Sequence, residues 1–112
     1  MEDKQDIENQ ASLFSVLADP TRLALLRLLM KQKEPHPLCV NALAFHLGVT
    51  QPAVSQHLKV LKSAGLVKME RHGYRIHYFV DEEAMIQAQN QISRVLIIEK
   101  RDSRNISEGT GQ

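Results

Sequence analysis

Residues 46–67 decide the fold of this chain, and they read HLGVTQPAVSQHLKVLKSAGLV. Gly48 suits the left-handed backbone conformation that ends a short apolar helix. Thr50 can cap a second helix through its hydroxyl group, and Pro52 is tolerated in a first turn because the N–H groups there lack partners within the helix. Gly65 is suited to end this second helix. The stretch therefore predicts a helix end, a tight turn and a complete second helix.

The second helix of this pair has one apolar and one polar face. Val54, Leu58 and Leu61 recur at i, i+4 and i+7 and form a stripe suited to burial. No Asp or Glu occurs between residues 51 and 65, whereas an ordinary solvated helix face mixes both signs of charge. The opposite face carries amide, hydroxyl and ammonium groups, which can donate to phosphates and contact base edges. We predict a recognition helix; the alternative is an ordinary amphipathic helix with a solvated face.

A β-hairpin is predicted directly after the recognition helix. Residues 66–71 and 75–80 are rich in β-branched and aromatic residues, and Gly73 supplies the positive φ that a short loop over residues 72–74 requires. A two-stranded hairpin is not stable alone, so this one must pack against the helices. Its tip carries cationic side chains that can contact phosphates or enter a minor groove. The alternative is an edge hairpin that its charges keep soluble.

The helix and the hairpin together define the predicted DNA-contacting surface. Gln51, Ser55 and Gln56 are expected to reach base edges, while the cations hold phosphates. The predicted DNA-binding residues are Thr50, Gln51, Ala53, Ser55, Gln56, His57, Lys59 and Lys62 in the helix-turn-helix, and Arg71, His72 and Arg75 in the hairpin.

The charge of the chain is distributed unevenly. The 112 residues carry a formal net charge of +1, but residues 35–80 hold five Lys or Arg and one acid, so this segment carries +4 and the remainder −3. A basic middle between more acidic ends is the pattern expected where the middle binds a polyanion. We therefore expect double-stranded DNA as a partner.

Length and composition favour a single cytoplasmic domain. A chain of 112 residues forms one modest core, which favours oligomerisation. No apolar run approaches the roughly 20 residues of a membrane span, and the charged N-terminus lacks the apolar segment of a signal peptide. The single cysteine excludes an intrachain disulfide framework and fits a reducing compartment. No phosphate loop, zinc-protease motif or nucleophile elbow appears, so we do not expect an enzyme.

Further helices complete the predicted architecture. The second helix of the chain is apolar over too wide an arc for a surface helix and is expected at the centre of the core. The predicted fold class is mainly α with a small β-hairpin wing, that is, a winged helix-turn-helix of about five helices. We expect this domain over residues 6–100, between a flexible N-terminus over 1–5 and a disordered polar tail over 101–112. The helices outside the recognition helix are expected over residues 6–17, 20–31, 40–47 and 81 to about 100.

The last predicted helix carries more apolar surface than one small core needs. Residues 95–98 read VLII, which exceeds one narrow stripe. The surplus indicates burial against another subunit, together with the first helix, and so a homodimer. Packing within the monomer is the alternative. The predicted interface residues are Phe14, Met85, Ala88, Ile92, Val95 and Leu96.

The chain resembles the ArsR/SmtB family of winged-helix repressors over about residues 11–98. The segments that carry this resemblance are residues 14–23 (FSVLADPTRL), 51–61 (QPAVSQHLKVL) and 64–67 (AGLV), followed by the hairpin through Tyr78. The resemblance implies a helical dimer with a hairpin wing, operator binding that blocks transcription, and release by an inducer. It also implies that His57 belongs to the structural framework of the recognition helix and is not a ligand.

The inducer sites familiar in this family are incomplete here. Metal-sensing members often carry Cys-x-Cys at the start of the third helix, because two thiolates bind arsenic, cadmium or lead, but the matching residues are Cys39-Val40-Asn41. Other members bind zinc through His and carboxylate pairs on the last helix, and no His occurs between residues 81 and 100. We therefore expect no metal and no cofactor, and the inducer is unknown. The alternative metal ligands are His36, Cys39 and His46.

Cys39 allows two interpretations. One is a small, half-buried side chain that packs under the preceding linker. The other is a reactive thiol at a helix N-terminus, whose oxidation or capture would disturb the helix that braces the recognition helix and make the protein a metal or redox sensor. A further alternative to DNA binding is a winged-helix module for protein interaction, which would not need the basic face.

Overall fold

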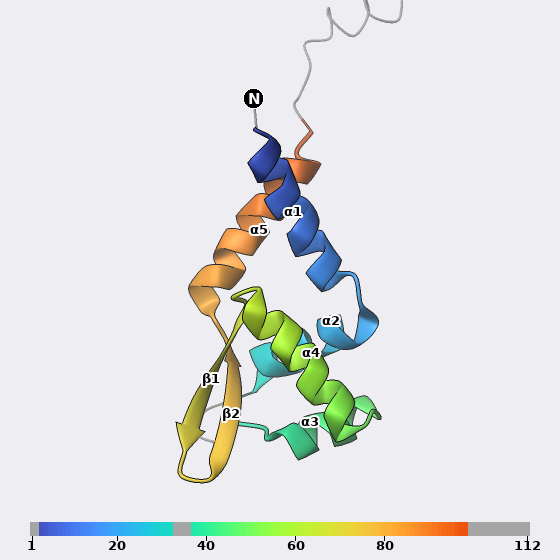
Figure 1. The fold of residues 1–112 in the computed structure, drawn as a ribbon, viewed down its shortest axis with the longest axis vertical. Coiled ribbons are helices and arrows are strands. Elements are labelled where there is room, and N and C mark those ends of the chain that lie inside the picture. Colours follow the sequence, from blue (N-terminus) through green and yellow to red (C-terminus); the bar gives the residue numbers. More distant parts are fainter. Residues whose placement is uncertain (1–2, 33–36, 99–112) are drawn as a thin grey trace, which may run out of the picture.

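The computed structural model describes residues 3–32 and 37–98 (Figure 1). The helices α1 and α5 lie together at one end of the molecule, and α2, α3, α4 and the hairpin lie at the other (Figure 1). The predicted order of elements, with five helices and one hairpin among the described residues, is confirmed. The elements are α1 (Lys4–Leu17), α2 (Pro20–Lys31), α3 (Val40–Leu47), α4 (Gln51–Ser63), β1 (Val67–His72), β2 (Arg75–Val80) and α5 (Glu82–Leu96).

The core lies between α2, α3 and α4. Leu25 of α2 and Leu43 of α3 are fully enclosed, as is the predicted stripe of α4. Residues from the start of β1 close the core beside α4. The expected central position of α2 and the burial of the α4 stripe are therefore confirmed. The buried apolar residues of the described chain are Leu25, Leu26, Leu29, Leu43, Ala44, Val54, Leu58, Leu61, Leu66 and Val67.

Local capping defines the helix-turn-helix formed by α3 and α4. Gly48 has a φ of 66° and follows the last residue of α3. The hydroxyl oxygen of Thr50 accepts a hydrogen bond from the N–H of Ala53 at 3.3 Å, and Pro52 lies in the first turn of α4. These three features confirm the predicted turn, because each satisfies or avoids an unpaired backbone group at a helix end.

The helices at the two ends of the chain differ from their predicted bounds. α1 begins at Lys4, two residues early, because the carboxylate of Asp3 caps it by accepting from the N–H of Asp6 at 2.8 Å. Lys4 and Gln5 thus belong to the helix, and their assignment to a flexible N-terminus was wrong. α5 ends at Leu96 instead of near residue 100, and the next residue already has an extended backbone, which the β-branched residues of this run favour. The predicted tail over 101–112 lies outside the described residues.

The hairpin is tighter than predicted. β1 and β2 pair antiparallel, from Val67 opposite Val80 to His72 opposite Arg75. Because His72 is paired, the loop consists of Gly73 and Tyr74 alone, and the predicted three-residue loop was wrong. Gly73, the first residue of the loop, has a φ of 67°. Two-residue hairpin loops need a positive φ at this position, which glycine adopts without strain.

α5 packs against α1, and its half-buried Met85 and Ala88 contact the edge of the core. The side chain of the buried Gln10 on α1 donates to Oε1 of Gln91 on α5 at 3.0 Å. None of the residues of α5 is buried within the protomer. No helix in the described part of the chain is both long and apolar enough to cross a membrane.

Candidate nucleic-acid interface

The polar face of α4 is exposed opposite its buried stripe. Gln51, Ser55 and Gln56 lie in the first half of the helix, followed by Lys59 and Lys62, and all of these side chains are exposed. The helix contains no carboxylate. The fold thus presents amide, hydroxyl and ammonium groups on one continuous face, as a surface that contacts phosphates and base edges requires.

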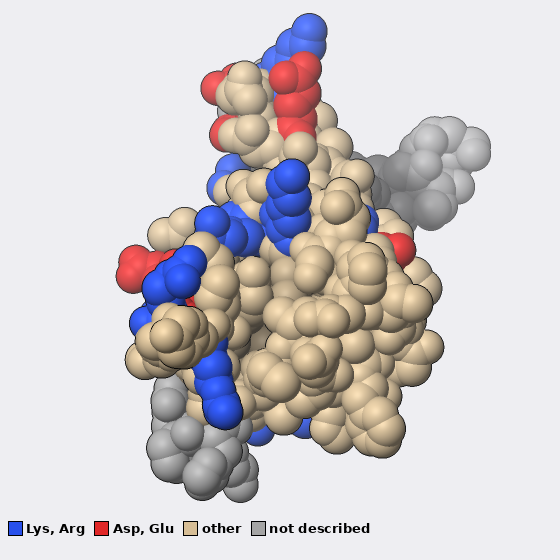
Figure 2. Space-filling view, turned by 60° about the horizontal axis from the view of Figure 1, so that its bottom comes forward, with Lys and Arg blue, Asp and Glu red and all other residues tan. Residues whose placement is uncertain are grey.

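The hairpin adds two arginines and a histidine beside this face. Arg71, His72 and Arg75 are all exposed near its tip. Nε2 of His72 lies 3.2 Å from Oε1 of Glu70, so this imidazole already has an acidic neighbour within the wing. Figure 2 shows blue side chains at the left and centre of the molecule, while red side chains lie at the upper end and toward the edges of the view. The exposed Lys and Arg side chains of the candidate interface come from both α4 and the wing.

His57 and Ala53 are the two predicted DNA contacts that are not fully exposed in the fold. Both are half-buried, and the side chain of His57 is 22 % exposed. Nδ1 of His57 lies 3.3 Å from Nη1 of Arg22 and 3.8 Å from a carboxylate oxygen of Asp19. This placement agrees with the framework role that the family resemblance implied for His57.

Arg22 ties α1, α2 and α4 together. Its guanidinium donates through Nη2 to the carbonyl oxygen of Ser15 at 3.2 Å and through Nε to the carbonyl oxygen of Val16. These carbonyls belong to the last turn of α1, where a cation also interacts favourably with the helix dipole. Because Nη1 of Arg22 also contacts His57, the Arg22 side chain fixes the position of α4 relative to the end of α1. No separate signal in the sequence marked this role, although Arg22 lies within a segment that carries the resemblance.

Asp19 completes this junction as the N-cap of α2. Its carboxylate accepts from the N–H of Arg22 at 3.0 Å, and this hydrogen bond, assisted by the nearby His57 and Arg22 side chains, lowers the pKa of Asp19 below its ordinary value of 3.8. Because the pKa is lowered on folding, the stabilisation is present at pH values above 3.8 and is lost as the pH falls through the lowered pKa. The cap is therefore intact at neutral pH.

Gln32 anchors the wing to the helices. Its Nε2 donates to the carbonyl oxygen of Tyr78 in β2 at 2.7 Å, and its Oε1 accepts from the N–H of Leu38, just before α3, at 2.9 Å. Gln32 is also the C-cap of α2, and its backbone N–H donates to the carbonyl oxygen of Leu28 at 3.0 Å. One side chain thus fixes the hairpin relative to the helix-turn-helix. No motif marked Gln32, because its two partners are specified only by the tertiary fold.

An apolar face remains open on α5 and the neighbouring α2. Leu96 is 65 % exposed and Val95 is 43 % exposed, whereas the other predicted interface residues are half-buried in the protomer. Ile86 of α5 and Met30 of α2 are also exposed, and with Met85 they line a groove of about 280 Å³ between the two helices. Ile86 and Met30 were not among the predicted interface residues, because the sequence of either helix alone does not specify the angle at which α2 and α5 approach.

The alternative metal ligands do not come together among the residues described. Cys39 is the N-cap of α3, its side chain makes no capping hydrogen bond, and it is exposed. The interpretation of Cys39 as a half-buried packing residue is therefore wrong, because its position at the end of the linker leaves it facing solvent. His46 is exposed at the far end of α3, and His36 lies outside the described residues. No group of three metal-binding side chains occurs within residues 3–32 and 37–98.

Zinc, cadmium and arsenite are expected to leave DNA binding unchanged. The lone exposed side chain of Cys39 supplies one soft ligand, whereas tight binding of these ions needs several. Duplex affinity should be the same with and without each ion, for the wild type and for Cys39→Ser, in a fluorescence anisotropy titration. An ion that weakens binding of the wild type but not of Cys39→Ser would contradict this expectation.

Comparison with known proteins identifies the family. Residues 19–69 match the family described as bacterial regulatory protein, arsR family. An uncharacterised HTH-type transcriptional regulator of Methanocaldococcus jannaschii is 40 % identical over 76 residues, which cover 67 % of this chain and 82 % of the relative. A transcriptional repressor SmtB homologue of Synechocystis is 35 % identical over 86 residues, which cover 77 % of this chain and 62 % of the relative.

A solved structure extends the likeness to the whole fold. The solution structure of the homodimeric winged helix-turn-helix DNA-binding domain of a possible ArsR-family regulator from Mycobacterium bovis superposes with a TM-score of 0.64 at 26 % identity. The match covers 91 % of this chain and 94 % of that one. All three of these relatives are named as transcriptional regulators or repressors. With the helix-turn-helix, the hairpin wing and the matched segment in agreement, the chain belongs to the ArsR/SmtB family of winged helix-turn-helix transcriptional regulators.

Proposed function

We propose that this regulator is a repressor that binds an inverted-repeat DNA operator as a homodimer. The observation that carries the proposal is the exposed face of α4, which has no carboxylate and lies beside the cationic wing. An interaction module without DNA contacts would not need such a face. The SmtB homologue of Synechocystis is described as a transcriptional repressor, which supports the direction of regulation.

The dimer supplies the symmetry of the proposed operator. Each chain has one recognition helix, so a twofold dimer would place two of them in successive major grooves about 34 Å apart, one helical turn of DNA. The open apolar face of α5, with its exposed Leu96, is the surface proposed for the subunit contact. The M. bovis domain with the same fold is homodimeric, which supports this assembly.

The exposed residues divide into two roles on the proposed operator. Gln51, Ser55 and Gln56 come from the first half of α4, the part that enters a major groove first, and are assigned to base edges. The exposed cations of α4 and the wing are assigned to phosphates, which carry affinity without sequence information. Lys59, Lys62, Arg71 and Arg75 form this second set.

Gln56→Ala and Arg75→Ala are expected to separate these two roles. Loss of the Gln56 amide should reduce discrimination by about 1–3 kcal/mol at one base pair of the operator. Loss of Arg75 should weaken binding to all duplexes alike and reduce the slope of log affinity against log salt by about 1. Titrations of operator and scrambled duplexes over a range of salt concentrations measure both effects.

Lys31→Ala is the matched control for Arg75→Ala. Lys31 is an exposed cation in the last turn of α2, outside the proposed interface, so its loss should leave the salt slope unchanged. A wild type that binds no genomic fragment at low salt would contradict DNA binding and favour the protein-interaction module. A wild type that sediments as a monomer at micromolar concentration would contradict the dimer.

A further inference from the structure

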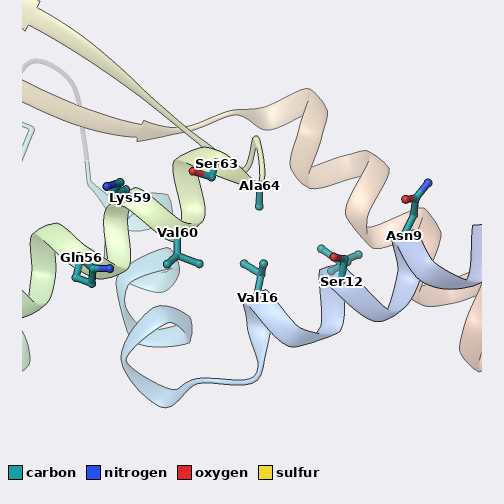
Figure 3. A pocket seen from close by; sticks show the side chains of 9 residues that line it. Asn9, Ser12, Val16, Gln56, Lys59, Val60, Ser63 and Ala64 are labelled. Carbon is teal, nitrogen blue, oxygen red and sulfur yellow. The ribbon is translucent and has the colours of Figure 1, made fainter. Parts of the chain in front are cut away.

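A groove lies between α1 and α4, lined from Asn9 to Val16 on α1 and from Gln56 to the end of α4. It has a volume of about 510 Å³, within the range of roughly 300–1,000 Å³ that is typical of small-molecule sites. Val16 of α1 faces Val60 of α4 and Ala64, the C-cap of that helix, across it (Figure 3). Leu13 also lines it from the α1 side. The inner surface of the groove is therefore apolar and is built from two helices.

The rim of this groove is polar and carries one sign of charge. Gln56 and Lys59 line it from α4, and Ser12 lines it from α1 (Figure 3). Lys59 is its charged residue, and the described residues that line the groove include no carboxylate. An apolar interior with an ammonium group and hydrogen-bond donors at the edge is complementary to a molecule with an apolar body and an anionic group.

The groove shares residues with the proposed DNA interface. Gln56 and Lys59 line the groove and also belong to the exposed polar face of α4. An anion that pairs with Lys59 would remove this ammonium group from the phosphates. The groove also adjoins the junction that sets α4, because the carbonyl oxygen of Val16 accepts from Arg22 and Arg22 contacts His57. An occupant can therefore act on DNA binding through shared residues and through the position of α4.

We propose that the groove between α1 and α4 binds a small amphipathic anion, such as an aromatic carboxylate or sulfonate, and that its binding releases DNA. The release rests on the proposed DNA-binding function, whereas binding of the anion does not. Leu13, Val16, Val60 and Ala64 take the apolar body, and Lys59 takes the anionic group.

The binding test uses 1-anilinonaphthalene-8-sulfonate, whose fluorescence rises in apolar surroundings, and its uncharged relative N-phenyl-1-naphthylamine. Ser12→Trp fills the groove from an exposed position of α1, and Ser15→Trp is the matched control on the same helix outside the groove. We expect saturable binding of the sulfonate to the wild type and Ser15→Trp, and binding weakened by about tenfold or more in Ser12→Trp. Lys59→Leu should weaken binding of the sulfonate but not of the uncharged probe, because only the sulfonate pairs with the ammonium group.

The release test measures operator affinity with and without the sulfonate. The sulfonate should lower the affinity of the wild type and Ser15→Trp by about tenfold or more and leave that of Ser12→Trp unchanged. Equal binding of the sulfonate to wild type and Ser12→Trp would overturn the proposal, since the probe would then occupy another apolar surface, such as that of α5. Dissociation of Ser12→Trp into monomers would also overturn it, because the groove would then be a subunit contact.

The two proposals fail in different ways. If no variant binds DNA but Ser12→Trp still abolishes sulfonate binding, the DNA-binding function is wrong and the anion site stands. If operator binding is normal and the sulfonate neither binds in the groove nor changes affinity, the anion site is wrong and the DNA-binding function stands.

Discussion

Leu96→Glu is expected to dissociate the proposed dimer and to lower operator affinity by about 100-fold or more. Leu96 is 65 % exposed in the protomer and lies at the end of the apolar face of α5. In a twofold dimer that buries this face, the substitution would bury two carboxylates without partners, one from each subunit. Each unpaired buried charge costs several kcal/mol. A monomer would then contact only one half-site, so both association and operator affinity should fall.

Sedimentation velocity and operator titration measure this effect, with Gln87→Glu as the matched control. Gln87 is exposed on α5, on the side of the helix opposite Leu96, so the same charge there should leave the dimer intact. Circular dichroism of the monomer should show unchanged helix content, since Leu96 is exposed and does not pack against the core. A Leu96→Glu variant that stays dimeric and binds normally would place the subunit interface elsewhere.

Arg22→Ala is expected to lower the free energy of unfolding by about 1.5–3 kcal/mol, the range for hydrogen bonds that involve a charged group. The substitution removes the donors to the carbonyl oxygens of Ser15 and Val16 and the contact with His57. The backbone N–H of residue 22 would still donate to Asp19 at the start of α2, so the measured loss of stability comes from the guanidinium alone. Because this group sets α4 relative to α1, operator affinity should also fall by about tenfold.

Urea unfolding and operator titration test this expectation, and two further variants separate its causes. Arg27→Ala removes an exposed arginine from the same helix and should change neither quantity by more than about 0.5 kcal/mol. Arg22→Lys keeps the charge but lacks the planar fork that reaches several acceptors, so it should recover only part of the loss. Full recovery with lysine would mean that charge alone matters and that the fork does not position α4.

The wing depends on a different residue for its position. Gln32 holds β2 through the carbonyl oxygen of Tyr78 and holds the start of α3 through the N–H of Leu38. Arg22 and Gln32 thus set the two parts of the proposed DNA interface from opposite ends of α2. This division explains how a small core can orient both a recognition helix and a hairpin, since each is tied to the same central helix.

The sequence by itself determined the features that depend on neighbouring residues. Thr50 caps α4 from three residues away, Gly48 ends α3 with its own φ, and the stripe of Val54, Leu58 and Leu61 follows from the helical repeat. Helix ends, faces and turns obey such short-range rules, so the helix-turn-helix, the hairpin and the exposed polar face could be predicted. The start of α1 also has a local cause, the Asp3 cap, although the helix was predicted to begin two residues later.

Only the tertiary structure decided the features that join distant residues. His57 meets Arg22 across 35 positions of sequence, and Gln32 meets Tyr78 across 46. The groove between α1 and α4 and the exposed face shared by α2 and α5 likewise depend on the angles at which helices pack. No periodicity or motif encodes these angles, because they result from how the side chains of several elements fill one core.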